Sequence, residues 1–138
     1  MKLRVLFVIF LIISLTACSS TKQTDIADEA IFYGEGEHWS VKYIYNPELY
    51  DEKKVNWVEI ELKDLELSKE DLYNIDIEFE GRDGLITGNV GDMVTKIKGN
   101  VISFLVGTVN NETYKEDEYK FKIKFKDKQD VIRLQLLN

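Results

Sequence analysis

Hydrophobic and polar residues alternate along most of the chain beyond residue 38. Trp39, Val41, Tyr43 and Tyr45 share one parity, and polar residues stand between the first three. This period of two is typical of a β-strand with one buried face. The pattern recurs four more times, which predicts four more strands. Their apolar sets are Val58, Ile60 and Leu62; Ile75, Ile77 and Phe79; Tyr119, Phe121, Ile123 and Phe125; and Ile132, Leu134 and Leu136.

Turn signals separate these segments. Asn46-Pro47 ends the first strand, and Gly99-Asn100 predicts a tight hairpin turn. Ser68 and Asp71 are spaced to cap a single helical turn. Weaker strands are expected at residues 85–90 and 93–98, beyond the turn Gly-Arg-Asp-Gly at 81–84. Residues 101–106 are apolar at both parities except for one serine, which predicts a strand covered on both faces or a central core strand.

The spacing of these elements indicates the fold class. Short strands follow one another at intervals of about ten residues, with turn signals between them and no long helical period. We therefore expect an all-β fold of about eight or nine strands. The favoured architecture is an antiparallel β-sandwich, immunoglobulin-like in broad outline. No Cys…Trp…Cys pattern is present, so an antibody-type domain is not expected.

The amino terminus has a different pattern. Lys2 and Arg4 precede an uninterrupted apolar run at residues 5–13, which is the layout of a secretory signal peptide. The run is shorter than the roughly 20 apolar residues that a membrane-spanning helix requires. We therefore expect a cleaved leader rather than a retained transmembrane helix. This leader could be an ordinary signal peptide that happens to precede a cysteine, which is the alternative to the lipoprotein leader described next.

The run Leu15-Thr16-Ala17-Cys18 ends in the single cysteine of the chain and resembles the lipobox of bacterial lipoproteins. The resemblance implies cleavage after Ala17 and a diacylglyceryl thioether on Cys18. Two acyl chains anchor a protein stably, whereas one chain binds only reversibly. The expected organisation is a signal peptide at 1–17, a lipidated cysteine and flexible tether at 18–29, and a β-sandwich domain at 30–138. The expected location is the extracytoplasmic face of the cell membrane.

A second resemblance lies at residues 34–39, Gly-Glu-Gly-Glu-His-Trp. This Gly-Glu-Gly-x-x-Trp opening is similar to that of small Gram-positive lipoproteins of uncharacterised function, which have no activity to transfer. The glycines would permit a turn or bulge, and Trp39 would be the largest apolar side chain entering the core.

Charge and cysteine content narrow the functions further. The chain has 18 basic side chains, and two of them, Lys2 and Arg4, would be removed with the leader. The mature chain would keep 16 basic and 25 acidic side chains, which gives a formal net charge of −9. Nucleic-acid binding requires a basic patch, so it is not expected of this acidic exported chain. No disulfide can form within the mature chain, and no cofactor is expected.

His38 is the only histidine, and Glu37 is adjacent to it. It could serve as a general base or a metal ligand. One imidazole without a second ligand at metal-site spacing favours a solvated histidine at a strand end, and no metal site is expected. No serine stands in a nucleophile-elbow motif either. The chain is therefore not expected to be an enzyme.

The candidate binding surface is a row of lysines, Lys120, Lys122, Lys124 and Lys126, at alternate positions of one strand. Such a row could meet an anionic wall polymer or lipid head groups. Two alternatives remain open. The lysines could protect an exposed edge strand, or they could pair across strands with the acidic rows Glu59 and Glu61 or Asp76, Glu78 and Glu80.

Two further residue groups have structural interpretations that we favour. Tyr33, Tyr43, Tyr45, Tyr50 and Trp57 could form a sugar- or peptide-binding face, but most have the parity of core positions. Asp83, Asn89 and Asp92 could bind calcium, but their spacing does not match an EF-hand, and turn chemistry accounts for them.

The sequence thus favours a non-catalytic binding or interaction module of the cell envelope. Its partners would be the membrane, through Cys18, and an envelope protein or an anionic wall polymer. The alternative is a small inhibitor or immunity-type protein that blocks an enzyme or toxin through its acidic surface.

Overall fold

The fold is described by a computed structural model that covers residues 23–64, 66–93 and 95–138. The leader and Cys18 lie outside the described residues. The helices and strands are β1 (Ala30–Glu35), β2 (Trp39–Tyr45), α2 (Pro47–Lys53), β3 (Val55–Leu62), η1 (Asp71–Asn74), β4 (Ile75–Glu80), β5 (Leu85–Asn89), η2 (Val90–Asp92), β6 (Thr95–Lys98), β7 (Val101–Gly107), β8 (Glu118–Phe125) and β9 (Lys128–Leu136).

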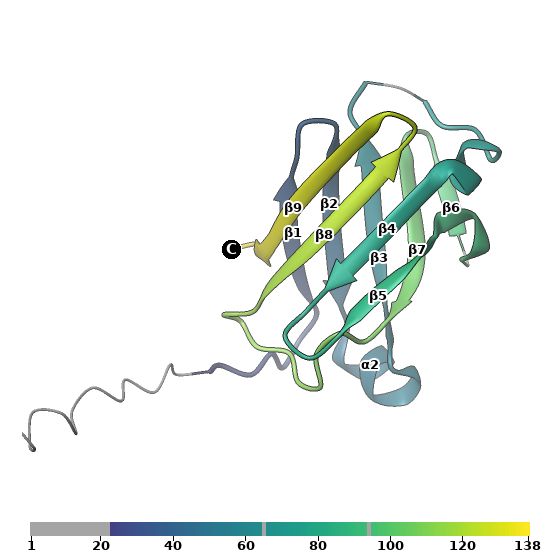
Figure 1. The fold of residues 1–138 in the computed structure, drawn as a ribbon. Coiled ribbons are helices and arrows are strands. Elements are labelled where there is room, and N and C mark those ends of the chain that lie inside the picture. Colours follow the sequence, from purple (N-terminus) through teal and green to yellow (C-terminus); the bar gives the residue numbers. More distant parts are fainter. Residues whose placement is uncertain (1–22, 65, 94) are drawn as a thin grey trace, which may run out of the picture.

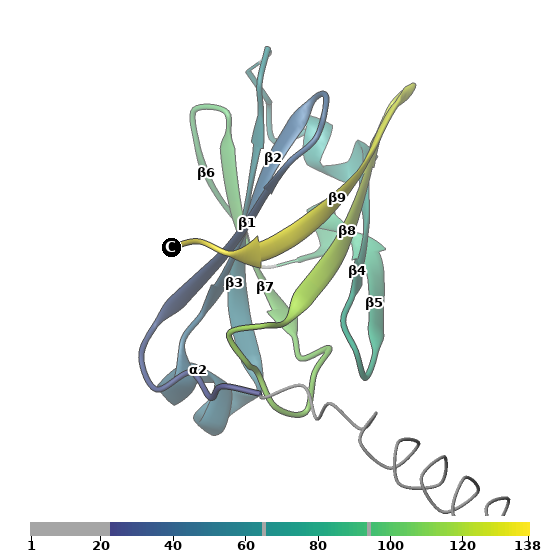
Figure 2. The same ribbon diagram turned by 90° about the vertical axis from the view of Figure 1, so that its left-hand side faces the viewer.

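The nine strands form one antiparallel sheet in the order β5-β4-β8-β9-β1-β2-β3-β7-β6. Figures 1 and 2 show that this sheet curls, so that β5, β4, β8 and β9 face the other five strands. The predicted all-β antiparallel fold is confirmed, and the strand number falls within the predicted range. The two halves are joined into a continuous sheet by pairing between β1 and β9.

The joint between the halves is short. Only Phe32–Leu136 and Tyr33–Gln135 are register pairs of β1 with β9, and the Leu137 amide donates one more bond to the Ile31 carbonyl. A Cβ on Gly34 would lie 2.2 Å from the Arg133 carbonyl oxygen. Only a residue without a side chain fits where the two strands approach this closely.

The alternating apolar positions face inward and form the core. Trp39 is fully buried, as predicted. An aromatic cluster joins the two facing halves: Phe32 and Tyr43 come from one, and Phe79 and Tyr119 from the other. The Tyr43 and Tyr119 ring centroids are 5.0 Å apart in an edge-to-face arrangement. Such pairs add about 0.5–1.5 kcal/mol each beyond their burial.

Of the two alternatives expected for β7, cover on both faces is wrong. Ile102, Phe104 and Val106 are buried, but the outward-facing Val101 and Leu105 are only partly buried. The outward apolar residues of β7 are not covered by another layer. Leu105 instead stands opposite Trp57 of β3 on the same outer face, so the contact is lateral.

The helix α2 was not predicted. Asn46 ends β2, as expected, and its side chain then accepts a hydrogen bond from the Leu49 amide at 3.1 Å. Pro47 occupies the start of the helix, where its missing N–H and fixed φ are tolerated. The Asn-Pro pair is therefore both a strand end and a helix start.

Candidate functional site

Three members of the lysine row stand on the outer face of β8, and Lys126 follows directly after the strand. Three of the four lysines contact acidic side chains. Lys120 lies 3.6 Å from Glu80, and Lys122 lies 3.6 Å from Glu78, both on the neighbouring strand β4. Lys126 lies 3.8 Å from Asp71 in η1. These contacts match the cross-strand alternative for the acidic row of β4.

The edge-protection alternative is wrong, because β8 lies between β4 and β9 rather than at the margin of the sheet. Lys124 stands opposite Asp76 in the register. In the described ranges no carboxylate lies within ion-pair distance of Lys124, so it is the row's least neutralised member.

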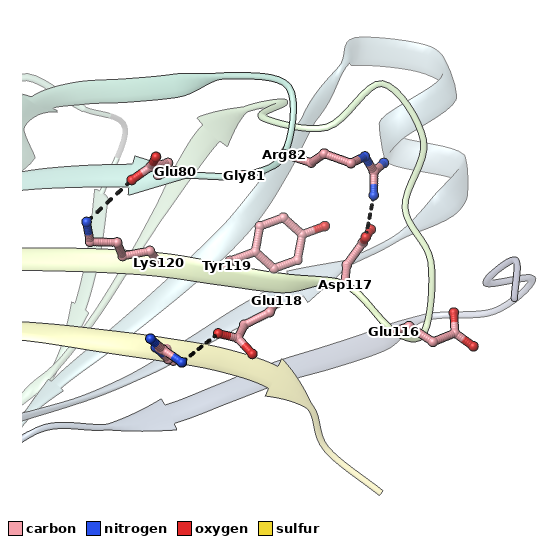
Figure 3. Close-up of a pocket in the computed structure, with 9 residues that line it drawn as sticks. Glu80, Gly81, Arg82, Glu116, Asp117, Glu118, Tyr119 and Lys120 are labelled. Atoms are coloured by element: carbon pink, nitrogen blue, oxygen red, sulfur yellow. Dashed lines mark hydrogen bonds and ion pairs between the residues drawn. The ribbon is translucent and has the colours of Figure 1, made fainter. Parts of the chain in front are cut away.

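An open groove of about 500 Å³ lies at the end of β4 and the start of β8 (Figure 3). Its lining carries both signs of charge, which favours polar ligands over apolar ones. The lining residues are Glu80, Gly81, Arg82, Glu116, Asp117, Glu118, Tyr119, Lys120 and Arg133.

Arg82 holds one side of this groove in place. Its guanidinium donates to Asp117 at 2.5 Å and to the Glu112 carbonyl at 2.8 Å, and it stacks over the Tyr114 ring. The contacts join the β4–β5 turn (residues 81–84) to the β7–β8 loop (residues 108–117). The guanidinium is thus held by this network rather than free for a ligand.

Below the groove the β7–β8 loop is tied to the core by buried polar groups. Asn110 is 4% exposed; its side-chain oxygen accepts a bond from the Arg82 amide, and its Nδ2 donates to Asp117 at 3.2 Å. The Tyr119 hydroxyl points toward this network in Figure 3 but has no hydrogen-bond partner among the described residues. Burial raises the pKa of Tyr119, so the phenol stays protonated.

The residues before β1 are docked on the same loop. The Thr24 amide and hydroxyl both donate to the Glu116 carboxylate, at 2.8 and 2.5 Å. The Lys115 amide donates to the Thr24 carbonyl at 2.9 Å, and Asp25 forms a β-bridge with Tyr114. The bonds from Thr24 lower the pKa of Glu116. The described part of the predicted tether therefore contacts the domain.

His38 is only partly exposed, and it has a partner that we did not predict. Its Nδ1 lies 2.7 Å from Oδ1 of Asp130 in β9, and its side chain is 23% exposed. The other oxygen of Asp130 accepts the His38 and Trp39 amides at 2.7 and 2.9 Å. Burial raises the pKa of Asp130, but these hydrogen bonds outweigh it and the net pKa is lowered. The carboxylate thus fixes the β1–β2 turn.

A signal for Asp130 was present in the sequence. It has the parity of Ile132 and Leu134, so the alternation of β9 places an acid at an inward position. A buried carboxylate requires hydrogen-bond donors, and the only histidine was an obvious candidate. No group of three potential metal-ligating side chains occurs in the part of the chain that the structure describes.

Five of the remaining candidates have structural roles. Tyr43, Tyr45 and Tyr50 are buried in the core. Asp83 accepts the Asn111 amide, and Asn89 caps η2 through the Gly91 amide, so both serve turns. None of the described helices is long and apolar enough to cross a membrane.

Comparison with known proteins leaves these sites without an assigned role. No protein family, curated protein or solved structure matches the chain.

Proposed function

We propose that the protein is a lipid-anchored, extracytoplasmic binding module of the cell envelope without catalytic activity. The observation that carries this proposal is the run Leu15-Thr16-Ala17-Cys18 behind a basic and apolar leader. The net charge of the mature chain and the single β-domain are consistent with such a module.

The docked segment at Thr24 supports a specific arrangement of this module. Six Cα–Cα steps separate Cys18 from Thr24, and they span at most roughly 21 Å in any conformation. Thr24 is bonded to Glu116 in the β7–β8 loop. A lipid on Cys18 would therefore hold this end of the domain near the membrane and leave the opposite end, with the β1–β2 turn, facing outward.

Replacing the cysteine tests the anchor. A Cys18→Ala protein should lose the diacylglyceryl mass and leave the membrane fraction, whereas the wild-type chain should be recovered there with the modification on its first residue. An unmodified wild-type polypeptide released into the medium would contradict the proposal.

An anionic wall polymer is the first partner to test. The lysine row would have to bind it in competition with Glu78 and Glu80, which already neutralise two of its members. A Lys122→Glu/Lys124→Glu protein should bind poly(glycerol phosphate) more weakly than wild type if the row is the binding surface. Unchanged affinity would remove this partner.

The alternative is an inhibitor or immunity-type protein that binds a basic partner. One observation favours it: at the tether end, around α2 and the β7–β8 loop, exposed carboxylates outnumber the exposed Lys53, Lys54 and Lys115. The carboxylates are Asp28, Glu29, Glu48, Asp51, Glu52 and Glu112. Recovery of a single tight protein partner, with affinity that falls steeply with salt, would favour this function over polymer binding.

A further inference from the structure

The sheet has two edges, and only one of them is protected. Edge strands expose unpaired backbone groups, and natural proteins usually guard them with charges or short length. β6 has four residues and carries Lys96 and Lys98 on its outer face, with Lys96 over the Trp57 ring. β5 has the sequence Leu-Ile-Thr-Gly-Asn, without a charge, and Leu85 is 57% exposed. In Figure 2, β5 lies at the free margin of its layer.

Backbone hydrogen bonding shows which groups of β5 are free. The Gly81 amide donates to the Gly84 carbonyl, so these residues form the bonded pair that closes the β4–β5 turn. Bonded and non-bonded pairs alternate in an antiparallel ladder. Leu85 and Thr87, opposite Glu80 and Glu78, are therefore non-bonded toward β4 and direct their N–H and C=O groups to the open edge. No other segment in the described ranges pairs with β5 on that side.

The charges beside this edge indicate the kind of strand that fits. The outer faces of β4 and β5 carry Asp76, Glu78 and Glu80 and no cation, because the lysines are one strand further away on β8. Asp76 accepts a hydrogen bond from Asn89 and has no ion-pair partner within the described ranges. A depression of about 520 Å³ opens on this face; Asp76, Glu78 and Thr87 line it on β4 and β5, and Lys122 and Lys124 line it on β8. A long basic side chain from an added strand would meet carboxylates first.

If the protein is anchored as proposed above, a second copy of the chain does not fit this edge. Pairing β5 with β5 in antiparallel fashion requires a two-fold axis perpendicular to the sheet, which reverses the strand direction. The β4–β5 turn and Thr24 are both bonded to the β7–β8 loop, so they lie at the same end of the domain. The two anchors would then leave from opposite ends of the pair, which conflicts with the upright arrangement proposed above for each copy.

We propose that the open edge of β5, through the backbone of Leu85 and Thr87, accepts an extended segment of a partner protein whose outward side chains are basic or uncharged. Backbone bonds supply the affinity in such strand addition, and alternate side chains supply the specificity. The added strand extends the half of the sheet that contains β4, β8 and β9.

The test uses the full-length protein in detergent and the peptide acetyl-Lys-Val-Thr-Val-Lys-Val-Thr-amide as the probe. NMR titration should shift the amide signals of Leu85 and Thr87 and slow their hydrogen exchange. A peptide with both lysines replaced by glutamate should bind at least tenfold more weakly. A peptide N-methylated at its lysine and threonine amides should not bind.

Two edge variants provide the matched comparison. Thr87→Pro removes an edge-facing N–H without removing a β4–β5 bond, and should weaken binding at least tenfold. Thr95→Pro makes the same change on the edge of β6 and should leave binding unchanged. If Thr87→Pro does not fold, Thr87→Lys introduces at β5 the charge that guards β6 and should have the same effect on the basic peptide.

Several outcomes would overturn the proposal: no binding of the basic peptide, equal binding of the acidic one, protection of β6 instead of β5, or unchanged binding by both Thr87 variants. A dimer that Thr87→Pro dissociates would assign the edge to a second copy instead. Cys18→Ala should lose the membrane but retain peptide binding, so failure of the anchor and failure of the edge are separate results.

Discussion

Asp130 organises the end of the domain that carries the β1–β2 turn, through three hydrogen bonds to two consecutive residues. Its carboxylate is buried, and it holds the His38 and Trp39 amides together with the His38 ring. Trp39 is also a fully buried core side chain. The turn of the β1–β2 hairpin and the first inward residue of β2 are thus fixed by one side chain from β9.

We expect Asp130→Ala to lower the free energy of unfolding by about 3 kcal/mol, because it leaves buried amides without an acceptor. Asp130→Asn retains one acceptor oxygen and should lose less. Urea denaturation at pH 7 measures both. Equal stability of wild type and Asp130→Ala would show that water satisfies these amides.

The same residue predicts a pH dependence. In the folded protein the pKa of Asp130 is lowered below its ordinary value. The ionised carboxylate therefore contributes fully to the free energy of unfolding above the unfolded pKa of about 3.9, and this contribution is lost as the pH falls through the folded pKa. The stability difference between wild type and Asp130→Asn should therefore shrink as the pH is lowered from 6 toward 2. A difference that is constant over this range would contradict the assignment.

The sequence could predict individual site residues only in part. Parity placed Trp39 and the tyrosines of β2 correctly in the core. His38 was singled out, but its partner lies 92 residues away, and a local pattern does not show which strands pair. The row of lysines could be recognised because charge alternation is a local pattern. Its pairing could not, because the register with β4 depends on the whole fold.

At the scale of elements, the period of two predicted the strongly alternating strands because each has one buried and one exposed face. β5 and β6 were recognised with less precise ends, since glycines and short length weaken their pattern. β7 was expected to be covered on both faces or to be a central core strand because its residues are apolar at both parities. The sequence cannot distinguish a covering layer from a lateral neighbour such as Trp57.

The close approach of β1 and β9 makes Gly34 a sensitive position. A Cβ there would lie 2.2 Å from the Arg133 carbonyl oxygen and 2.7 Å from Cγ2 of Ile132. We expect Gly34→Ala to cost about 2 kcal/mol of stability, since the backbone of β9 has to move. Gly84→Ala is the control: its nearest contact is an ordinary 3.7 Å, and the change should stay within about 0.5 kcal/mol in thermal or urea unfolding.

The pairing of β8 with β4 predicts a small electrostatic coupling. The Lys122–Glu78 pair is half-exposed, so a double-mutant cycle with Lys122→Ala and Glu78→Ala should give roughly 0.5 kcal/mol. The coupling should fall when salt is raised to 1 M. A coupling of zero at low salt would show that these lysines are not engaged by β4.

At the scale of the whole molecule, the described residues just before β1 are bonded to the domain. Thr24 and Asp25 are bonded to the β7–β8 loop, which in turn is held by Arg82 and Asn110. Composition predicted a flexible tether because the segment is polar and aperiodic. It gave no indication that a carboxylate 92 residues away would bind Thr24.

We expect Glu116→Gln to loosen this segment without unfolding the domain. Hydrogen exchange of the Lys115 amide, which donates to the Thr24 carbonyl, should accelerate at least severalfold. Global stability should change by less than about 1 kcal/mol, because the bonds are exposed. Glu52→Gln, which alters an exposed carboxylate on α2, should leave that amide unaffected; unchanged exchange in Glu116→Gln would contradict the docking.

The short joint between β1 and β9 also determines how the domain would respond to mechanical load. Tension applied between Ala30 at the start of β1 and the β5 edge enters the sheet through β1 and leaves through β4. Between these strands the ladder narrows to two register pairs. Shear would concentrate at this joint, so under stretching the two halves should part there before either half unravels.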